Sequence, residues 1–162
     1  MQQKANFPFF HPIRVRYSEV DAQAVVYNAH YVTYFDIGIT EFLRTLAFDY
    51  SIAAVKRTGK DFHTVKVTVE YQQPAYYDDE LLIGLRVLRI GRSSLTWGLA
   101  IFRQGEETSL AQGEVIWVYT DMTTHRSTPL PDLLVSELRA VAGKGESIQF
   151  TKQDHLGQSL SL

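Results

Sequence analysis

The sequence predicts an α+β domain in which an antiparallel sheet wraps over one long helix. Two observations support this fold class. Apolar residues recur at helical spacing over 28–46, and four strand-like segments follow one another after that helix with only turns between them. Strands that succeed one another without intervening helices favour an α+β architecture over an alternating α/β one.

The first strand is expected over 7–17, where apolar side chains alternate with Arg14 and Arg16. It leads into a short polar loop that carries a lone acid, Asp21, and then into the apolar pair Val25 and Val26.

The helix over 28–46 is the clearest element of the sequence. Its apolar side chains share one face: Tyr31, Phe35, Gly38, Ile39, Phe42, Leu43 and Leu46. Asn28 stands at the N-cap position, where its side chain can accept a hydrogen bond from an early N–H group. The free N–H groups of the first turn form a partial positive pole. Asp21 therefore faces a positive pole seven residues away in the chain, an arrangement suited to stabilising an oxyanion.

Segment 51–61 is polar and is expected to be a connector. The later strands are expected over 64–71, 81–90, 94–103 and 110–120. In the first of these, Val65, Val67, Val69 and Tyr71 share a face. Gly91 and Arg92 fit a two-residue hairpin turn in which Gly91 supplies the positive φ.

A short helix is expected after Pro131, with Leu134, Leu138 and Val141 aligned on one side. At 162 residues the chain has the length of one ordinary domain. We expect a single domain over 1–141 and a polar, glycine-containing tail over 142–162.

The composition excludes several functional classes. The chain has no cysteine, which rules out disulfides, a thiolate nucleophile and a cysteine-ligated zinc site. A formal net charge of −2 gives no reason to expect nucleic-acid binding. No apolar run approaches the roughly 18 to 20 residues of a membrane span, and the N-terminus lacks the pattern of a secretory signal. We therefore expect a soluble, cytoplasmic protein.

Several segments together resemble the 4-hydroxybenzoyl-CoA thioesterase family of hotdog-fold enzymes. The resemblance covers roughly residues 10–140. The segments that carry it, in chain order, are YSEVD (17–21), VVYN (25–28), Tyr31, EFLR (41–44), VEY (69–71), Pro74-Ala75, YDDEL (77–81) and GRSS (91–94).

The resemblance implies hydrolysis of an acyl-CoA thioester, with Asp21 attacking the carbonyl or activating a water. A carboxylate is already ionised at pH 7 and needs no partner to activate it. Asn28, through its main-chain N–H, matches the position that polarises the carbonyl oxygen. No metal and no cofactor is implied, because coenzyme A is part of the substrate. The hotdog fold is a curved antiparallel sheet wrapped around the long helix; its open edges predict a homodimer joined edge to edge, and the resemblance also fits a dimer of dimers.

The remaining candidate residues concern substrate binding. Tyr27 and Tyr31 are candidates for the wall of an acyl pocket, and His30 and His63 for residues that reach it. A basic turn offers guanidinium and hydroxyl donors suited to the phosphates of coenzyme A; it consists of Arg89, Arg92, Ser93 and Ser94.

Two positions leave alternatives open. The family commonly carries glycine three residues after the aspartate, where this chain has Ala24, so the loop is expected to differ or to be slightly strained. Glu19 is a candidate general acid/base partner of Asp21 or a metal ligand, although we expect a solvated residue at a strand end. The alternative functions are a hotdog hydratase or dehydratase, which needs an acid/base pair, and a non-catalytic acyl-CoA binding protein.

Overall fold

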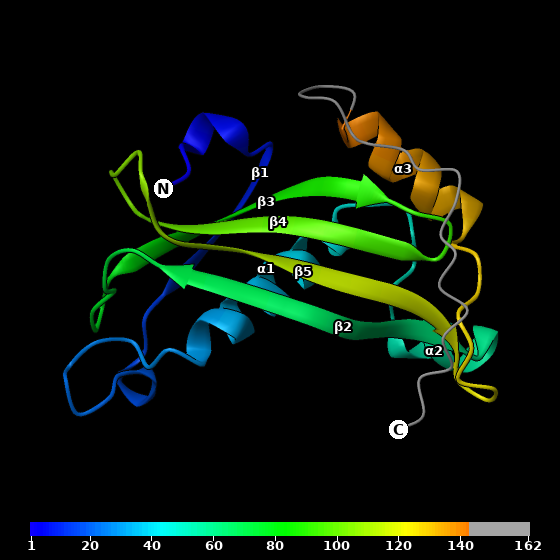
Figure 1. The fold of residues 1–162 in the computed structure, drawn as a ribbon, viewed down its shortest axis with the longest axis horizontal. Helices are drawn as coiled ribbons and strands as arrows, with labels where there is room; N and C mark the ends of the chain where they lie inside the picture. The colour runs from blue at the N-terminus through cyan, green and yellow to red at the C-terminus, as the bar shows by residue number, and fades with distance from the viewer. Residues whose placement is uncertain (143–162) are drawn as a thin grey trace.

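The computed structural model describes residues 1–142, and the expected tail lies outside them apart from Ala142 (Figure 1). No helix within this range is long and apolar enough to cross a membrane. The elements in chain order are η1 (Lys4–Asn6), β1 (Phe9–Arg14), η2 (Tyr17–Glu19), α1 (His30–Arg44), α2 (Ile52–Thr58), β2 (Lys60–Tyr71), β3 (Glu80–Ile90), β4 (Ser94–Arg103), β5 (Ser109–Asp121) and α3 (Asp132–Ala142).

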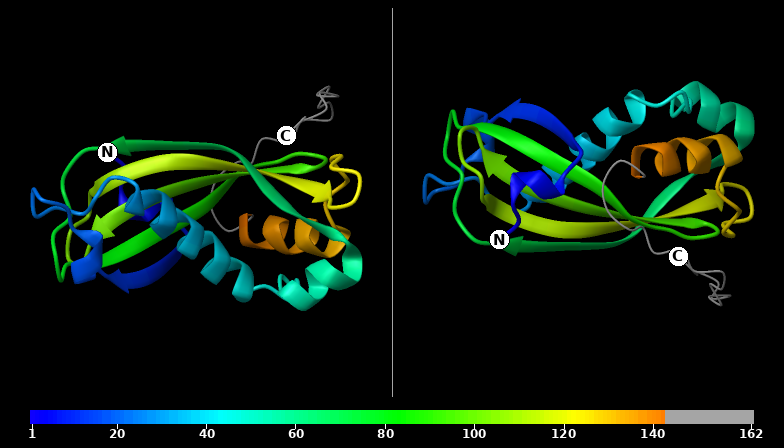
Figure 2. Two further views of the ribbon diagram at one scale, coloured as in Figure 1. Left: turned by 90° about the horizontal axis from the view of Figure 1, so that it is seen from below. Right: turned by 90° about the horizontal axis from the view of Figure 1, so that it is seen from above.

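The five strands form one antiparallel sheet in the order β1-β3-β4-β5-β2. This confirms the predicted sequence of a strand, a long helix and four further strands. β1 and β2 are the two edges of the sheet. Both views in Figure 2 place α1 and α3 on the same side of the sheet, so one face of the sheet carries the helices.

The core lies between α1 and this face. The apolar stripe predicted for the helix is buried from Tyr31 to Leu43, and Phe35 and Ile39 are fully enclosed. The helix ends at Arg44, so Leu46 lies beyond it and is half-buried. Gly38 lets the helix approach β3 closely, because a Cβ built there would lie 2.6 Å from Cγ2 of Ile83. Packing at this distance anchors α1, and therefore its first turn, to the centre of the sheet.

The first strand is shorter than predicted. It ends at Arg14, after which the Val15 N–H donates to the Asp79 carbonyl oxygen and η2 begins. The cause is Glu19, whose carboxylate accepts the Arg16 N–H at 2.8 Å and closes a tight turn. Tyr17, the last residue of the expected strand, consequently lies in η2 and is 80% exposed.

The helix boundaries also differ from the prediction. The N-cap residue of α1 is Ala29 rather than Asn28, and no side chain caps the helix. The expected connector contains α2. Ser51 begins this helix by accepting the Ala54 N–H at 3.1 Å, and Gly59 ends it with a φ of +65°.

Two details of the strands were wrong. Val65 sits at a β-bulge between Thr64 and Lys66 and is 44% exposed, so it does not share the inner face with its neighbours. The turn after β3 comprises residues 91–93, and the Gly91 N–H donates to the Ser94 carbonyl oxygen at 2.8 Å. Gly91 does not adopt the predicted positive φ, because it pairs with Ser94 at the base of the turn and does not occupy its tip.

Candidate active site

The loop that carries Asp21 is closed at its base by main-chain hydrogen bonds. The carbonyl oxygen of Glu19 accepts the Tyr27 N–H at 2.9 Å, and the Asp21 N–H donates to the Val25 carbonyl oxygen at 2.9 Å. The two arms of the loop therefore pair with each other. This pairing fixes the segment that carries Asp21 to the segment that leads directly into α1.

The Asp21 side chain has one oxygen engaged inside this loop. Oδ1 accepts the Gln23 N–H at 2.8 Å, whereas Oδ2 has no hydrogen-bond partner among residues 1–142. Ala24 adopts a φ of +61°, the left-handed conformation that glycine takes without strain. The expectation of slight strain is confirmed, and the loop keeps the turn that a glycine would make.

The same loop is attached to the connection between β2 and β3. The Val26 N–H donates to the Ala75 carbonyl oxygen at 2.8 Å, and Val25 forms an isolated bridge with Tyr76. The acid-bearing loop, the β2–β3 connection and the first turn of α1 therefore meet at one end of the sheet.

At the start of α1, two main-chain N–H groups remain available. The N–H groups of His30, Tyr31 and Val32 donate to carbonyl oxygens three residues back. Those of Asn28 and Ala29 have no acceptor among residues 1–142. Two neighbouring free donors at a helix N-terminus are suited to bind an anionic oxygen.

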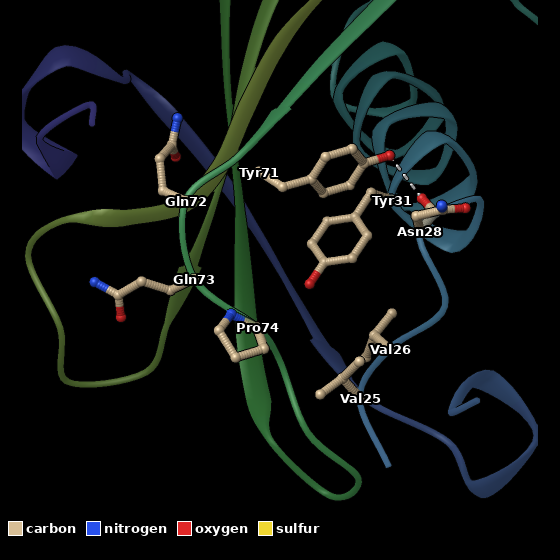
Figure 3. Close-up of a pocket in the computed structure, with 8 residues that line it drawn as sticks. All are labelled: Val25, Val26, Asn28, Tyr31, Tyr71, Gln72, Gln73 and Pro74. Carbon is tan, nitrogen blue, oxygen red and sulfur yellow. Dashed lines mark hydrogen bonds between the residues drawn. The ribbon is translucent and has the colours of Figure 1, made fainter. Parts of the chain in front are cut away.

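Tyr71 fixes the orientation of these donors. Its hydroxyl donates to the Asn28 carbonyl oxygen at 2.9 Å, as Figure 3 shows. That carbonyl belongs to the same planar peptide as the Ala29 N–H, so holding the oxygen also sets the direction of the N–H.

A pocket of about 280 Å³ opens beside these groups, lined by Val25, Val26, Asn28, Tyr31, Tyr71, Gln72, Gln73 and Pro74 (Figure 3). The Tyr31 and Tyr71 rings meet edge to face at 5.1 Å. The buried Tyr31 hydroxyl accepts the Ala75 N–H at 3.2 Å, and burial raises the pKa of this phenol, which keeps it protonated. The lining thus combines apolar side chains with a few polar groups, as is usual for a small-molecule pocket.

Two further predicted residues flank the helix start. Tyr27 is about half exposed and contacts the His30 ring edge to face at 6.1 Å. Neither residue lines the pocket, but Tyr27 directly precedes the lining residue Asn28 and His30 follows it by two positions.

The other predicted binding residues lie at the opposite end of the sheet. His63 is near the start of β2, with Nε2 3.4 Å from the Met122 sulfur, whereas the pocket adjoins the end of that strand. The basic turn lies at the far end of β3: Arg89 is in this strand, Arg92 and Ser93 are in the turn after it, and Ser94 begins β4. The eleven residues of β3 span about 30 Å or more, so within one chain these side chains and Asp21 do not form a single site.

Glu19 corrects a further expectation. It is buried, with 9% of its surface exposed, rather than solvated at a strand end. Its Oε2 accepts the Tyr34 hydroxyl at 2.8 Å in addition to the Arg16 N–H. These contacts turn the carboxylate inward and engage one of its two oxygens in the scaffold of the loop. Residues 1–142 contain no group of three or more histidine, aspartate or glutamate side chains that could hold a metal ion.

Sequence reasoning missed Tyr71, Ala75 and the two glutamines beside them as parts of the site. Tyr71 was assigned to a strand face by its period alone. Its contact with Asn28 joins residues 43 positions apart, and no local pattern signals such a contact.

The arrangement combines an acid with a free carboxylate oxygen, two free N–H donors and an apolar pocket. Comparison with known proteins identifies the family to which the chain belongs. The sequence profile of the thioesterase superfamily matches residues 23–110. The chain belongs to this superfamily.

Curated relatives support the assignment. The chain is 34% identical over 128 residues to the acyl-CoA thioester hydrolase YbgC of Escherichia coli O6:H1, covering 79% of this chain and 93% of the relative. It is 26% identical over 98 residues to a putative acyl-CoA thioesterase, YneP, of Bacillus subtilis, covering 60% of this chain and 70% of the relative.

Solved structures of this superfamily confirm the expected hotdog fold. A protein of Pseudomonas aeruginosa superposes with a TM-score of 0.78 at 25% identity, covering 91% of this chain and 98% of that one. A thioesterase of Thermus thermophilus, solved with coenzyme A and zinc, superposes with a TM-score of 0.70 at 26% identity, covering 87% of this chain and 98% of that one.

Proposed function

We propose that this protein hydrolyses an acyl-CoA thioester to a free acid and coenzyme A. The observation that carries the proposal is the pair of free N–H groups of Asn28 and Ala29, placed next to the pocket and to the Asp21 loop. Membership of the thioesterase superfamily and the activity printed for the Escherichia coli relative support the choice of a thioester as substrate.

In the proposed reaction, the thioester carbonyl oxygen lies against the N–H groups of Asn28 and Ala29. Asp21 either attacks the carbonyl carbon or removes a proton from a water that attacks it. Both routes put negative charge on the carbonyl oxygen and then break the C–S bond, which releases the thiolate of coenzyme A. When water attacks, the free acid forms in this step; when Asp21 attacks, a mixed anhydride forms, and water then hydrolyses it to the free acid and the regenerated carboxylate. Each well-aimed donor to that oxygen contributes about 100- to 1,000-fold in rate, so the two donors account for a large part of the proposed rate acceleration.

The coenzyme A portion is proposed to extend across a second copy of the chain. Arg92 and Asp21 lie at opposite ends of β3, and a phosphate-binding turn reaches Asp21 only if it comes from another protomer. β2 offers the contact for such a partner, because it is a twelve-residue edge strand that can extend the sheet. We therefore propose a homodimer with shared sites, which can pair further into a dimer of dimers.

The hydratase alternative has less support from the geometry. It needs an acid/base pair, for which the chain offers Asp21 or Glu19 with His30 or His63. Glu19 is hydrogen-bonded to Tyr34 and Arg16, and His63 lies at the far end of β2. The non-catalytic alternative required a displaced loop, whereas Ala24 takes up the glycine-like conformation.

The test is thiol release from a panel of short, long and aromatic acyl-CoAs, followed with a chromogenic thiol reagent. The proposal expects turnover that disappears in a folded Asp21→Ala variant. Product analysis separates the alternatives, because only hydrolysis releases free coenzyme A. A hydrated or dehydrated thioester as product, or binding without turnover on every substrate, would reject the thioesterase proposal.

A further inference from the structure

A buried hydrogen bond joins the Asp21 loop to the body of α1. Glu19, two residues before Asp21, directs its carboxylate inward, where Oε2 accepts both the Tyr34 hydroxyl and the Arg16 N–H at 2.8 Å. The Arg16 guanidinium is exposed, and its nearest nitrogen lies 3.9 Å from Oε1, the other carboxylate oxygen of Glu19. A carboxylate that is removed from water in this way needs its hydrogen-bond donors.

Tyr34 is the donor on the helix side. It lies in the second turn of α1 and is only 1% exposed. Burial raises the pKa of its hydroxyl, and the hydrogen bond to the Glu19 carboxylate raises it further, so the group remains a donor throughout the neutral range. Its ring packs against Tyr31, at 6.0 Å between centroids, and Tyr31 lines the pocket.

Glu19 also closes the loop through its main chain. Its carbonyl oxygen accepts the Tyr27 N–H, and Tyr27 directly precedes Asn28. Glu19 thus fixes both ends of the loop. Ahead of Asp21 its side chain bonds to Arg16 and Tyr34, and ahead of Asn28 its carbonyl oxygen bonds to Tyr27. The group that fixes Glu19 to the rigid helix is the Tyr34 hydroxyl.

We propose that Glu19 and Tyr34 form a positioning pair, which sets Asp21 at its working distance from the N–H groups at the start of α1. This inference rests on the proposed thioesterase function, and it gives Glu19 a role different from the acid/base or metal roles considered for it. Neither residue lines the pocket, so both act through Asp21 and Asn28 rather than on the substrate.

The expected kinetic signature follows from this indirect role. When the hydroxyl is removed, the loop gains freedom to move relative to the helix, while the pocket keeps its walls. A misplacement of about 1 Å between reacting groups costs on the order of 100-fold in rate. We therefore expect kcat to fall by about 10- to 100-fold in Tyr34→Phe, with KM close to that of the wild type.

The experiment compares four variants of the full chain. Tyr34→Phe and Glu19→Ala each break the bond, whereas Glu19→Gln keeps an acceptor oxygen for the Tyr34 hydroxyl and should recover most of kcat. Tyr119→Phe is the matched control, because it removes another buried tyrosine hydroxyl, one that pairs with Thr58 at the far end of the sheet. Amide hydrogen exchange over residues 20–28 measures loop mobility independently of activity.

The proposal expects faster exchange over 20–28 and a lower kcat in Tyr34→Phe, with neither change in Tyr119→Phe. Equal kcat in Tyr34→Phe and Tyr119→Phe, or unchanged exchange over the loop, would overturn it. So would a Glu19→Gln variant as impaired as Glu19→Ala. Wild-type protein without thioesterase turnover would reject the proposed function alone, since the exchange measurement still decides whether the pair holds the loop.

Discussion

Replacing Ala24 by glycine should stabilise the protein, which is unusual for an alanine-to-glycine change. Ala24 has a φ of +61° in the loop that carries Asp21. In this left-handed region the Cβ of an L-residue crowds the following carbonyl, and glycine has no Cβ. The substitution removes a methyl group that is exposed to solvent, so it leaves no cavity in the core.

The expected change in the free energy of unfolding is the difference between two contributions. Relief of the left-handed conformation is worth about 1–2 kcal/mol. Glycine gives the unfolded chain more freedom, which costs about 0.4–1 kcal/mol. The net gain in the free energy of unfolding is therefore between about 0 and 1.5 kcal/mol, and each kcal/mol raises Tm by about 2–4 °C for a chain of this size.

Ala22→Gly provides the matched control. Ala22 lies in the same loop, is exposed and does not have a positive φ, so this variant keeps only the unfavourable entropy term and should lose about 0.4–1 kcal/mol. Thermal unfolding of both variants, monitored by circular dichroism, should give shifts of opposite sign. If Ala24→Gly lowers Tm as much as Ala22→Gly does, the argument from strain is refuted.

Three other substitutions test the site and its scaffold. Tyr31→Phe leaves the buried Ala75 N–H without its acceptor, which should lower the free energy of unfolding by about 1–3 kcal/mol in a urea titration; an unchanged midpoint would contradict this contact. Gly113→Ala would put a Cβ 1.9 Å from the Thr68 carbonyl oxygen and should lower the free energy of unfolding by at least about 3 kcal/mol. A variant as stable as the wild type would exclude the β2–β5 register. Hydrogen bonds from the Thr124 and Thr123 N–H groups lower the pKa of Asp121 below its usual 3.8; the stability that this carboxylate contributes is present above that value and is lost as the pH falls below it. Asp121→Asn should therefore weaken the dependence of Tm on pH below about pH 4, and identical acid profiles would argue against the bonds.

The elements that the sequence predicted best are those with a strong local period. The stripe on α1 needs only residues three and four apart, and β4 was predicted over the same ten residues that it occupies. The helix 52–58 was missed because seven residues are too few for a periodic signal, although Ser51 and Gly59 marked its two ends.

The site was predicted in part for the same reason. The Asp21 loop and the start of α1 are neighbours in the chain, so spacing alone brings them together. The Tyr34–Glu19 and Tyr71–Asn28 bonds join residues 15 and 43 positions apart and depend on how the helix packs on the sheet. The separation of Arg92 from Asp21 depends likewise on the length and direction of β3, which no motif records.

The most direct test of the proposed mechanism is thiol release from one good acyl-CoA substrate by the wild type and by Asp21→Asn. Asparagine keeps an oxygen for the Gln23 N–H but removes the negative charge, and Asp121→Asn serves as the matched control at the other end of the sheet. We expect turnover to fall by about 1,000-fold or more in Asp21→Asn alone. Turnover within about tenfold of the wild type would contradict the assignment of Asp21 and move the chemistry to another residue.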